Sequence, residues 1–163
     1  MLLILVSMTS FALLVEFMRK SVNHFSRWFY GLFHFMLRDN ETKGQYTGAT
    51  WLLIGWTITV MLFKMPIAVA ALLFLSIGDS FAAIVGKLFP IIRIGNKTLS
   101  GTFSGFIVSS LFVLLVNQSL LPIVILSGSI VAMVVELIPS RLNDNLTMPI
   151  SSGLIMMYLD SIL

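Results

Sequence analysis

The charged residues of this chain are clumped, and long neutral apolar runs lie between the clumps. Hydrophobic residues occupy 58% of the 163 positions and charged residues occupy 10%, whereas soluble domains carry roughly 25% charged residues. A chain with so little polar surface is not a soluble enzyme, a nucleic-acid-binding domain or a disordered protein. Cysteine is absent, which also excludes disulfides, thiol nucleophiles and cysteine metal sites. We expect one domain over residues 1–163.

Breaks at charges, prolines, glycines and polar clusters divide the chain into six candidate membrane helices. A membrane helix needs ~20 mostly apolar residues, with ~17 as the lower limit. We therefore predict an all-α, polytopic integral membrane helix bundle with about six transmembrane helices. The candidates are Met1–Met18, Thr47–Phe63, Met65–Leu88, Leu99–Val116, Leu120–Ile138 and Leu146–Leu163.

The basic residues predict how this bundle is oriented. Nine of the ten Lys and Arg residues lie on one side of the predicted bundle, and Lys64 lies on the other. Cytoplasmic loops of membrane proteins carry an excess of Lys and Arg, so we expect the three longer loops in the cytosol and both termini outside. The nine are Arg19, Lys20, Arg27, Arg38, Lys43, Lys87, Arg93, Lys97 and Arg141.

The segment 19–43, between the first two candidate spans, has a pattern of its own. Polar residues recur at spacings of three and four, with aromatic and aliphatic residues on the opposite side. This pattern predicts an amphipathic helix that lies in the cytosolic headgroup layer. The polar positions are Asn23, Arg27, Tyr30, His34 and Arg38, and the apolar ones include Phe25, Trp28, Phe29, Leu32, Phe33 and Met36.

Several ionisable residues fall within or at the ends of the candidate spans, where charge is costly and therefore suggests a site. Glu16, Asp79, Lys87 and Glu136 are all placed in the cytosolic half by the predicted orientation. Carboxylates bind Mg²⁺ and basic side chains bind phosphate oxygens, so this mixture indicates a phosphate-bearing, metal-bound ligand. The adjoining loops add Arg93, Asn96, Lys97, Asn143, Asp144 and Asn145.

A purely structural role stays open for each of these residues. Asp79 can be satisfied by a neighbouring helix, and Lys87 can snorkel to the interface. Glu136 can form a salt bridge to Arg141, and Asn143–Asn145 can form a turn with a helix N-cap. Small residues at every fourth position favour close helix packing, and they are Gly78, Ala82 and Gly86, then Gly101 and Gly105.

The order of three motifs resembles the CTP-dependent polyprenol kinase family, which includes dolichol kinase, phytol kinase and CTP-dependent diacylglycerol kinase. It is more distantly similar to phosphatidate cytidylyltransferases. The motifs are Gly78–Lys87, then Asn96–Thr102 with Gly105-Phe106, then Glu136 followed by Asp144–Thr147 and Pro149. They occupy residues 78–105 and 136–149. The upstream runs Glu16–Arg19, Leu37–Glu41 and Thr47–Thr50 look like prokaryotic members of the family.

The resemblance implies transfer of the γ-phosphate of CTP to the hydroxyl of a lipid alcohol (a polyprenol, phytol, geranylgeraniol or diacylglycerol) at the cytosolic face of a prokaryotic plasma membrane. Asp79, Lys97 and Glu136 are the implied catalytic residues. Mg²⁺ or another divalent cation is the implied cofactor, with Asp79, Glu136 and Asp144 as its candidate ligands. The implied nucleotide-binding residues are Ser80, Lys87, Asn96, Thr98, Gly101, Asp144 and Asn145.

Two other functions stay open at this point. A phosphatidate-type cytidylyltransferase would attach CMP to a lipid phosphate and release pyrophosphate. A transporter or non-catalytic membrane subunit is favoured by Ser100, which stands where members of the kinase family usually carry a glutamate. The expected partners are CTP, the lipid substrate and membrane lipids, with a homo-oligomer or a partner subunit possible, and no nucleic acid.

Overall fold

A computed structural model describes residues 2–37, 41, 44–139 and 142–163, and it confirms an all-α chain. The chain also contains a short antiparallel hairpin of β1 (Arg93–Ile94) and β2 (Lys97–Thr98), which we did not predict. The first half contains α1 (Leu2–Ser21), α2 (Asn23–Phe33), the 3-10 turn η1 (His34–Met36) and α4 (Gly48–Leu62). The second half contains α5 (Met65–Leu73), the π-helical turn η2 (Phe74–Gly78), α6 (Asp79–Leu88), α7 (Leu99–Val116), α8 (Pro122–Leu137) and α9 (Asp144–Ile162).

Three of these helices are long and apolar enough to cross a membrane. They are α1, the continuous helix Met65–Leu88 that α5, η2 and α6 form together, and α7. The helices α4 and α8 are also apolar but shorter, with 15 and 16 residues. By length and composition these are the helices of a membrane protein.

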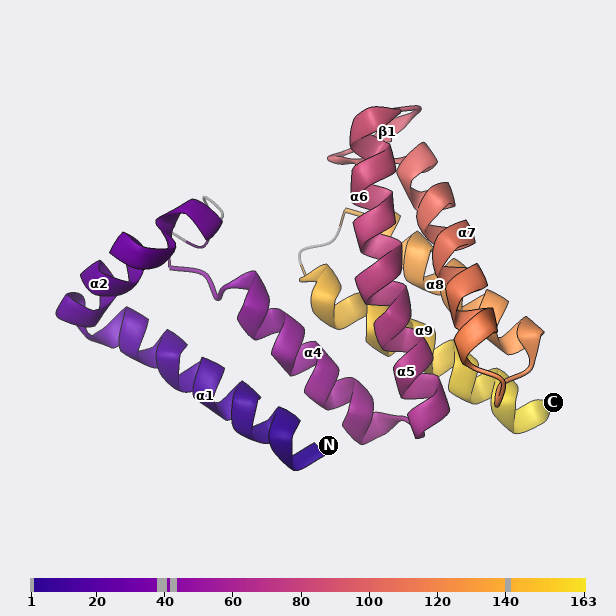
Figure 1. Cartoon of the computed structure of the whole chain (residues 1–163), viewed down its shortest axis with the longest axis horizontal. Coiled ribbons are helices and arrows are strands. Elements are labelled where there is room, and N and C mark those ends of the chain that lie inside the picture. Colours follow the sequence, from indigo (N-terminus) through magenta and orange to yellow (C-terminus); the bar gives the residue numbers. More distant parts are fainter. Residues whose placement is uncertain (1, 38–40, 42–43, 140–141) are drawn as a thin grey trace.

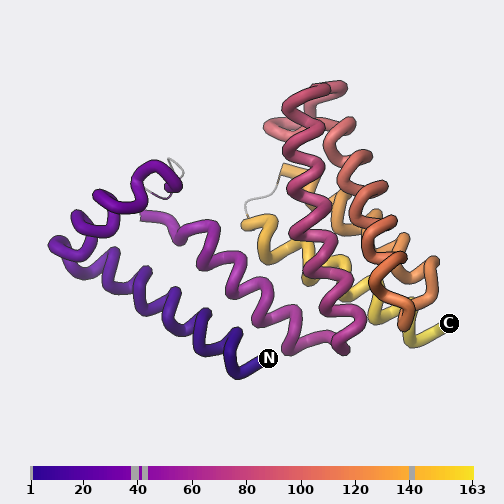
Figure 2. The backbone as a smooth tube through the Cα atoms, in the orientation of Figure 1, coloured from indigo at the N-terminus to yellow at the C-terminus, as the bar shows by residue number. Residues whose placement is uncertain are grey.

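The connections between helices alternate between the two ends of the molecule, as the predicted topology requires. Both chain termini lie at one end, together with the α4–α5 and α7–α8 connections (Figures 1 and 2). The β1–β2 hairpin, the end of α8 and the start of α9 lie at the opposite end. The predicted cytosolic loops therefore meet at one end of the molecule.

The core lies around the continuous helix formed by α5 and η2. Its small residues allow α8 and α9 to approach closely, since an alanine face keeps helix axes near one another. The buried side chains include Ile67, Ala68, Ala70, Ala71, Phe74 and Leu75 on this helix, Val124, Ile125, Ala132 and Met133 on α8, and Met148 and Met156 on α9.

The glycine pattern predicted for helix packing does bring α6 and α7 into backbone contact. A Cβ atom on Gly105 would lie 2.6 Å from the carbonyl oxygen of Gly78, and one on Gly101 would overlap the carbonyl oxygen of Ala82. A Cβ on Gly86 would lie 2.5 Å from the hydroxyl of Thr98. The packing role of these small residues is therefore confirmed.

Two predicted boundaries differ from the structure. The amphipathic segment expected over 19–43 begins later, because Arg19 and Lys20 complete the last turn of α1 and a new helix starts at Asn23. Arg38 and Lys43, which we assigned to this segment, lie outside the described residues. The helix α2 has no buried residue, and Trp28 and Leu32 are exposed on it.

The last helix begins two residues earlier than predicted, at Asp144, so Pro149 lies inside it and not in its first turn. A proline has no N–H, so the carbonyl four residues before it loses its helical donor. That carbonyl belongs to Asn145, and it faces Gly55 of α4 so closely that a Cβ on Gly55 would overlap it. The free carbonyl thus lies where α4 and α9 touch.

Replacing Gly101 by alanine should push α6 away from α7 and lower the free energy of unfolding by about 1–3 kcal/mol. The matched control is Gly31→Ala in α2, where an added Cβ meets nothing within 4 Å. Denaturation of purified protein in detergent measures both variants. Equal stability of the two variants would contradict the close packing of α6 and α7.

Candidate functional site

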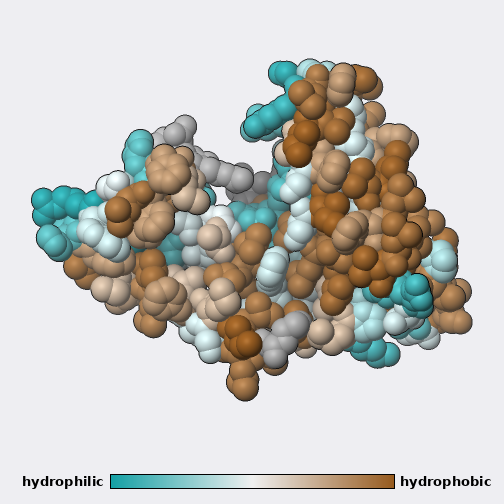
Figure 3. Space-filling view, viewed as in Figure 1, coloured by the Kyte–Doolittle hydropathy of each residue, from teal (hydrophilic) through white to brown (hydrophobic). Residues whose placement is uncertain are grey.

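One large cavity collects most of the residues singled out in the sequence. Its volume is about 1280 Å³, and α6, the hairpin, the end of α8 and the start of α9 contribute its polar side chains. Residues 44–46 and Trp51 complete it from the side of α4. Figure 3 shows a hollow between the α2 end and the α6–β1 end of the molecule, with hydrophilic surface at its floor. The cavity therefore opens at the end where the predicted cytosolic loops meet.

Asp79 is positioned by an irregularity in its helix. It directly follows the π-helical turn η2, and such turns occur frequently at functional sites. Ser76 lies within this turn, and its carbonyl oxygen accepts a hydrogen bond of 2.6 Å from the hydroxyl of Ser80. The π turn changes the direction in which the following residues project, so sequence periodicity alone cannot give the direction of Asp79.

Lys97 is positioned by the hairpin. Ile94 and Lys97 are paired across a two-residue loop in which Gly95 has a φ of +61°, a conformation that glycine adopts without strain. Thr98 then caps α7, because its hydroxyl accepts a hydrogen bond of 3.2 Å from the backbone N–H of Gly101. The cap and the loop together fix Lys97 directly before the first turn of α7.

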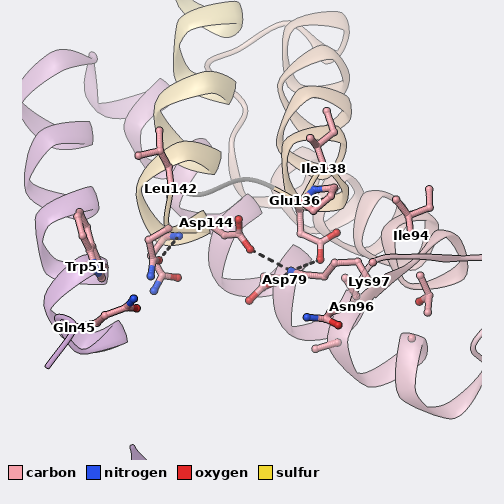
Figure 4. Close-up of a pocket in the computed structure, with 18 of the residues that line it drawn as sticks. Gln45, Trp51, Asp79, Ile94, Asn96, Lys97, Glu136, Ile138, Leu142 and Asp144 are labelled. Carbon is pink, nitrogen blue, oxygen red and sulfur yellow. Dashed lines mark hydrogen bonds and ion pairs between the residues drawn. The ribbon is translucent and has the colours of Figure 1, made fainter. Parts of the chain in front are cut away.

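The ammonium group of Lys97 is the centre of the site (Figure 4). Its Nζ lies 2.5 Å from Oε1 of Glu136, 3.3 Å from Oδ2 of Asp144 and 3.5 Å from Oδ1 of Asp79. Burial would lower the pKa of Lys97, but the hydrogen bond and charge of Glu136, with the charges of Asp79 and Asp144, outweigh it and raise this pKa above its ordinary value. Lys97 therefore stays positively charged throughout the neutral range.

Glu136 differs from the other two carboxylates in its burial. Its side chain is 3% exposed, and both oxygens are engaged: Oε1 with Lys97, and Oε2 with the hydroxyl of Thr102 at 3.2 Å. Asp79 and Asp144 are 40% and 33% exposed, with longer contacts to Lys97. Glu136 thus holds the lysine, whereas Asp79 and Asp144 present carboxylate oxygens to the cavity.

The carboxylates surround a lysine and not a shared metal position. Within the described residues, no group of three or more acidic, histidine or cysteine side chains is arranged to hold a metal ion. The expected ligand set of Asp79, Glu136 and Asp144 does meet, but around Nζ of Lys97. A resident metal centre made of all three carboxylates does not fit this geometry.

Further basic groups face the same cavity. Lys87 and Arg93 line it and are exposed, and neither is part of an ion pair among the residues that the structure describes. Lys20 also lines it, with its Nζ 3.8 Å from the centre of the Tyr46 ring. The cavity lining thus includes, among the described residues, four cations (Lys20, Lys87, Arg93 and Lys97) and three carboxylates (Asp79, Glu136 and Asp144), so positive side chains outside the Lys97 cluster are available to an anionic ligand.

The remaining predicted residues divide into two groups. Asn96, Thr98 and Asn145 line the cavity, whereas Ser80 and Gly101 are not among its lining residues. Asn145 is also held structurally, because its amide donates to the carbonyl of Gly48 at 3.1 Å. The predicted N-cap at Asn143 is confirmed, since its side chain accepts the N–H of Asn145 at 3.0 Å. The alternative partner of Glu136, Arg141, lies outside the described residues.

A second polar cluster, of which sequence reasoning recognised only parts, lies at the same end of the molecule. Arg19, 3% exposed, binds Glu16 through a salt bridge of 2.7 Å. Its guanidinium also donates to the backbone carbonyls of Glu41 and Gln45. Oε1 of Glu16 accepts the N–H of Thr47 at 2.7 Å. The cluster anchors the segment that leads into α4. Its sequence signals were the three-residue spacing of Glu16 and Arg19 and the runs Glu16–Arg19, Leu37–Glu41 and Thr47–Thr50, but nothing in them predicted that these residues meet.

Ser100, the residue at the position of the expected family glutamate, has a local structural role. Its hydroxyl donates to the carbonyl of Phe89 and accepts the N–H of Ile91 at 3.2 Å. These bonds join the end of α6 to the start of α7. Ser100 is not among the residues that line the polar cavity.

Comparison with known proteins gives one distant relative. The chain is 29% identical over 165 residues to "Uncharacterized protein RP860" of Rickettsia prowazekii (strain Madrid E). The alignment covers 91% of this chain and 77% of that protein. No protein-family model and no solved structure matches the chain. The similarity therefore extends along nearly the whole chain.

Replacing Lys97 by methionine should leave the Glu136 carboxylate buried without its cation. We expect the free energy of unfolding to fall by about 3 kcal/mol, at the lower end for a buried pair because Lys97 is itself 33% exposed. Denaturation in detergent measures the loss, and Lys64→Met, at an exposed lysine in the α4–α5 connection, is the control.

The difference in the free energy of unfolding between wild type and Lys97→Met should depend on pH in a defined direction. The native pKa of Lys97 is raised above 10.5, so its contribution is complete below pH 10.5 and is lost as pH rises through the native pKa. The stability gap between wild type and Lys97→Met should therefore persist at neutral pH and close as the pH rises into strong alkali. A gap that closes near neutral pH would contradict the assigned ion pairs.

Proposed function

We propose that this chain is a membrane kinase that transfers the γ-phosphate of CTP to the hydroxyl of a lipid alcohol. The observation that carries the proposal is the meeting of Asp79, Lys97, Glu136 and Asp144 in one cavity, from the four elements α6, β2, α8 and α9. Phosphoryl transfer depends mainly on positioning and charge neutralisation. A cavity that combines fixed carboxylates with further basic side chains can provide both the positioning and the charge neutralisation.

In the proposed reaction, the alcohol oxygen attacks the γ-phosphorus of CTP. The bond between the γ-phosphorus and the bridging oxygen breaks, and CDP leaves with that oxygen. A divalent cation bound with CTP would neutralise phosphate charge. Asp79 and Asp144, the two partly exposed carboxylates, would hold that cation and accept the hydroxyl proton.

The basic residues then bind the phosphates. Lys97 is held by Glu136, and a phosphate oxygen would contact it by replacing the longer contact to Asp79 or Asp144. Lys87 and Arg93 lie around the same cavity and extend the positive surface. Glu136 acts here as a positioning residue, because both of its oxygens are already engaged.

The proposal also sets the orientation of the chain in its membrane. Six spans, with both termini outside, would place the cavity at the cytosolic face of a prokaryotic plasma membrane. The three long apolar helices support this arrangement, and so does the gathering of the hairpin, the end of α8 and the start of α9 at one end (Figure 1). CTP would then enter from the cytosol, and the alcohol from the bilayer.

The test is a panel of lipid alcohols incubated with purified protein, Mg²⁺ and CTP labelled at either the γ- or the α-phosphate. We expect γ-label on the lipid. The appearance of α-label on a lipid phosphate would instead identify a cytidylyltransferase. Absence of both labels, together with no CTP binding, would overturn both enzyme functions and favour a transporter or a non-catalytic subunit.

Replacing Asp79 by asparagine should lower the rate of γ-phosphate transfer by at least about a hundredfold, the scale of a lost proton acceptor. The variant should still insert in the membrane, since Asp79 is 40% exposed and makes only a long contact with Lys97. Asp160→Asn, at an exposed position in the last turn of α9, is the matched control. Near-normal transfer by Asp79→Asn would remove Asp79 from the reaction.

A further inference from the structure

A second cavity lies beside the polar one and differs from it in character. Its volume is about 660 Å³, within the range of small-molecule sites. It runs along the first half of α7 and the last half of α8, and its walls are almost entirely apolar. We call it the α7–α8 groove. Its lining includes Leu99, Phe103 and Ile107 on α7 and Ile130, Met133 and Val134 on α8.

The groove adjoins the polar site through one side chain. Thr102 lines the groove, and its hydroxyl donates to Oε2 of Glu136 at 3.2 Å. The other oxygen of Glu136 holds Lys97 in the polar cavity. A single buried carboxylate therefore separates the apolar groove from the phosphate-binding groups.

The surroundings of the groove indicate a hydrocarbon occupant. The helix α7 is one of the three long enough to cross a membrane, and Phe103, Ile130 and Val134 are exposed on the outside of the bundle. The surface over α6 and α7 is largely hydrophobic (Figure 3). An apolar groove on such a surface opens toward lipid tails and not toward water.

The polar groups of its lining discriminate between lipids. Among the described residues, no charged side chain lines the groove, and its polar atoms include the hydroxyls of Thr102 and Ser104. An anionic phosphate headgroup would find no cation there, whereas these hydroxyl oxygens can accept a hydrogen bond from a neutral hydroxyl. The groove therefore suits a lipid alcohol better than a phospholipid.

We infer that the α7–α8 groove binds the hydrocarbon tail of the lipid-alcohol substrate, with its hydroxyl directed to the Thr102–Glu136 end. This inference rests on the proposed kinase function and adds the place where the acceptor binds. Residues along the groove would then set which tails are accepted. Ile130 and Phe103 lie along its walls and are the natural positions to probe.

The first test locates the tail directly. A long-chain isoprenoid alcohol with a diazirine on its tail is photolysed with the full chain in phosphatidylcholine vesicles, and the labelled peptides are identified by mass spectrometry. We expect labels on Phe103, Ile130 and their neighbours, and competition by excess unlabelled alcohol. The inference would be overturned if the labels were spread over all exposed helices, or if a diazirine-bearing phosphatidylcholine labelled the same residues. Either pattern is that of lipid surrounding the protein without a specific site.

The second test blocks the groove with a tryptophan and compares this variant with a matched control. Ile130→Trp fills it, whereas Ile123→Trp places the same side chain seven residues away on the same face of α8, outside the groove. Both positions are well exposed, at 50% and 57%, so neither substitution disturbs the core. We expect Ile130→Trp to raise KM for the long-chain alcohol at least about tenfold, the equivalent of two or so displaced methylene contacts.

Ile123→Trp, outside the groove, should leave the KM for the long-chain alcohol and the KM for CTP unchanged. Equal kinetics of the two tryptophan variants would overturn the groove as the tail site while leaving the kinase function intact. If wild type transfers no γ-label to any alcohol, the proposed function fails, and the photolabelling alone then decides whether the groove binds this tail.

Discussion

The burial of one carboxylate, Glu136, governs how the functional end of this protein is built. A buried carboxylate is stable only with a cation and hydrogen bonds to compensate its lost hydration. Lys97 and Thr102 provide them, at 2.5 and 3.2 Å. These partners come from the hairpin and from α7, so the last turn of α8 fixes both elements in place. Glu136 also lies at the junction between the polar cavity and the α7–α8 groove, which connects its structural role to the chemistry that we propose.

Backbone proximity is the second requirement of the site. The glycines of α6 and α7 let the two helices touch through their main chains, and this contact holds the hairpin against Asp79. On the opposite side, Asn145 joins α9 to Gly48 of α4, while Arg19 and Glu16 anchor the segment that leads into α4. The cavity therefore lies between two independently fixed walls. This arrangement suits a reaction in which positioning contributes most of the rate enhancement.

Much of this could be predicted from the residues, because each prediction rested on a local pattern. The candidate spans agree with the observed helices to within a few residues, since long apolar runs leave few places where a helix can end. The small-residue spacing correctly indicated close packing of α6 and α7. The predictions failed where neighbouring structure intervened: Pro149 lies inside α9 because Asn143 caps that helix early. The π turn before Asp79 and the pairing of Arg19 with backbone carbonyls left no periodic signal at all.

The sequence by itself determined that the chain forms apolar helices and that its charges gather at one end, because hydropathy and charge are properties of each residue. Only the tertiary structure decided that the three carboxylates meet around Lys97, that Glu136 is buried while Asp79 and Asp144 stay exposed, and that an apolar groove adjoins them. Those facts depend on distances between residues up to 65 positions apart, such as Asp79 and Asp144. Such distances arise from how helices pack, which no local pattern of residues encodes.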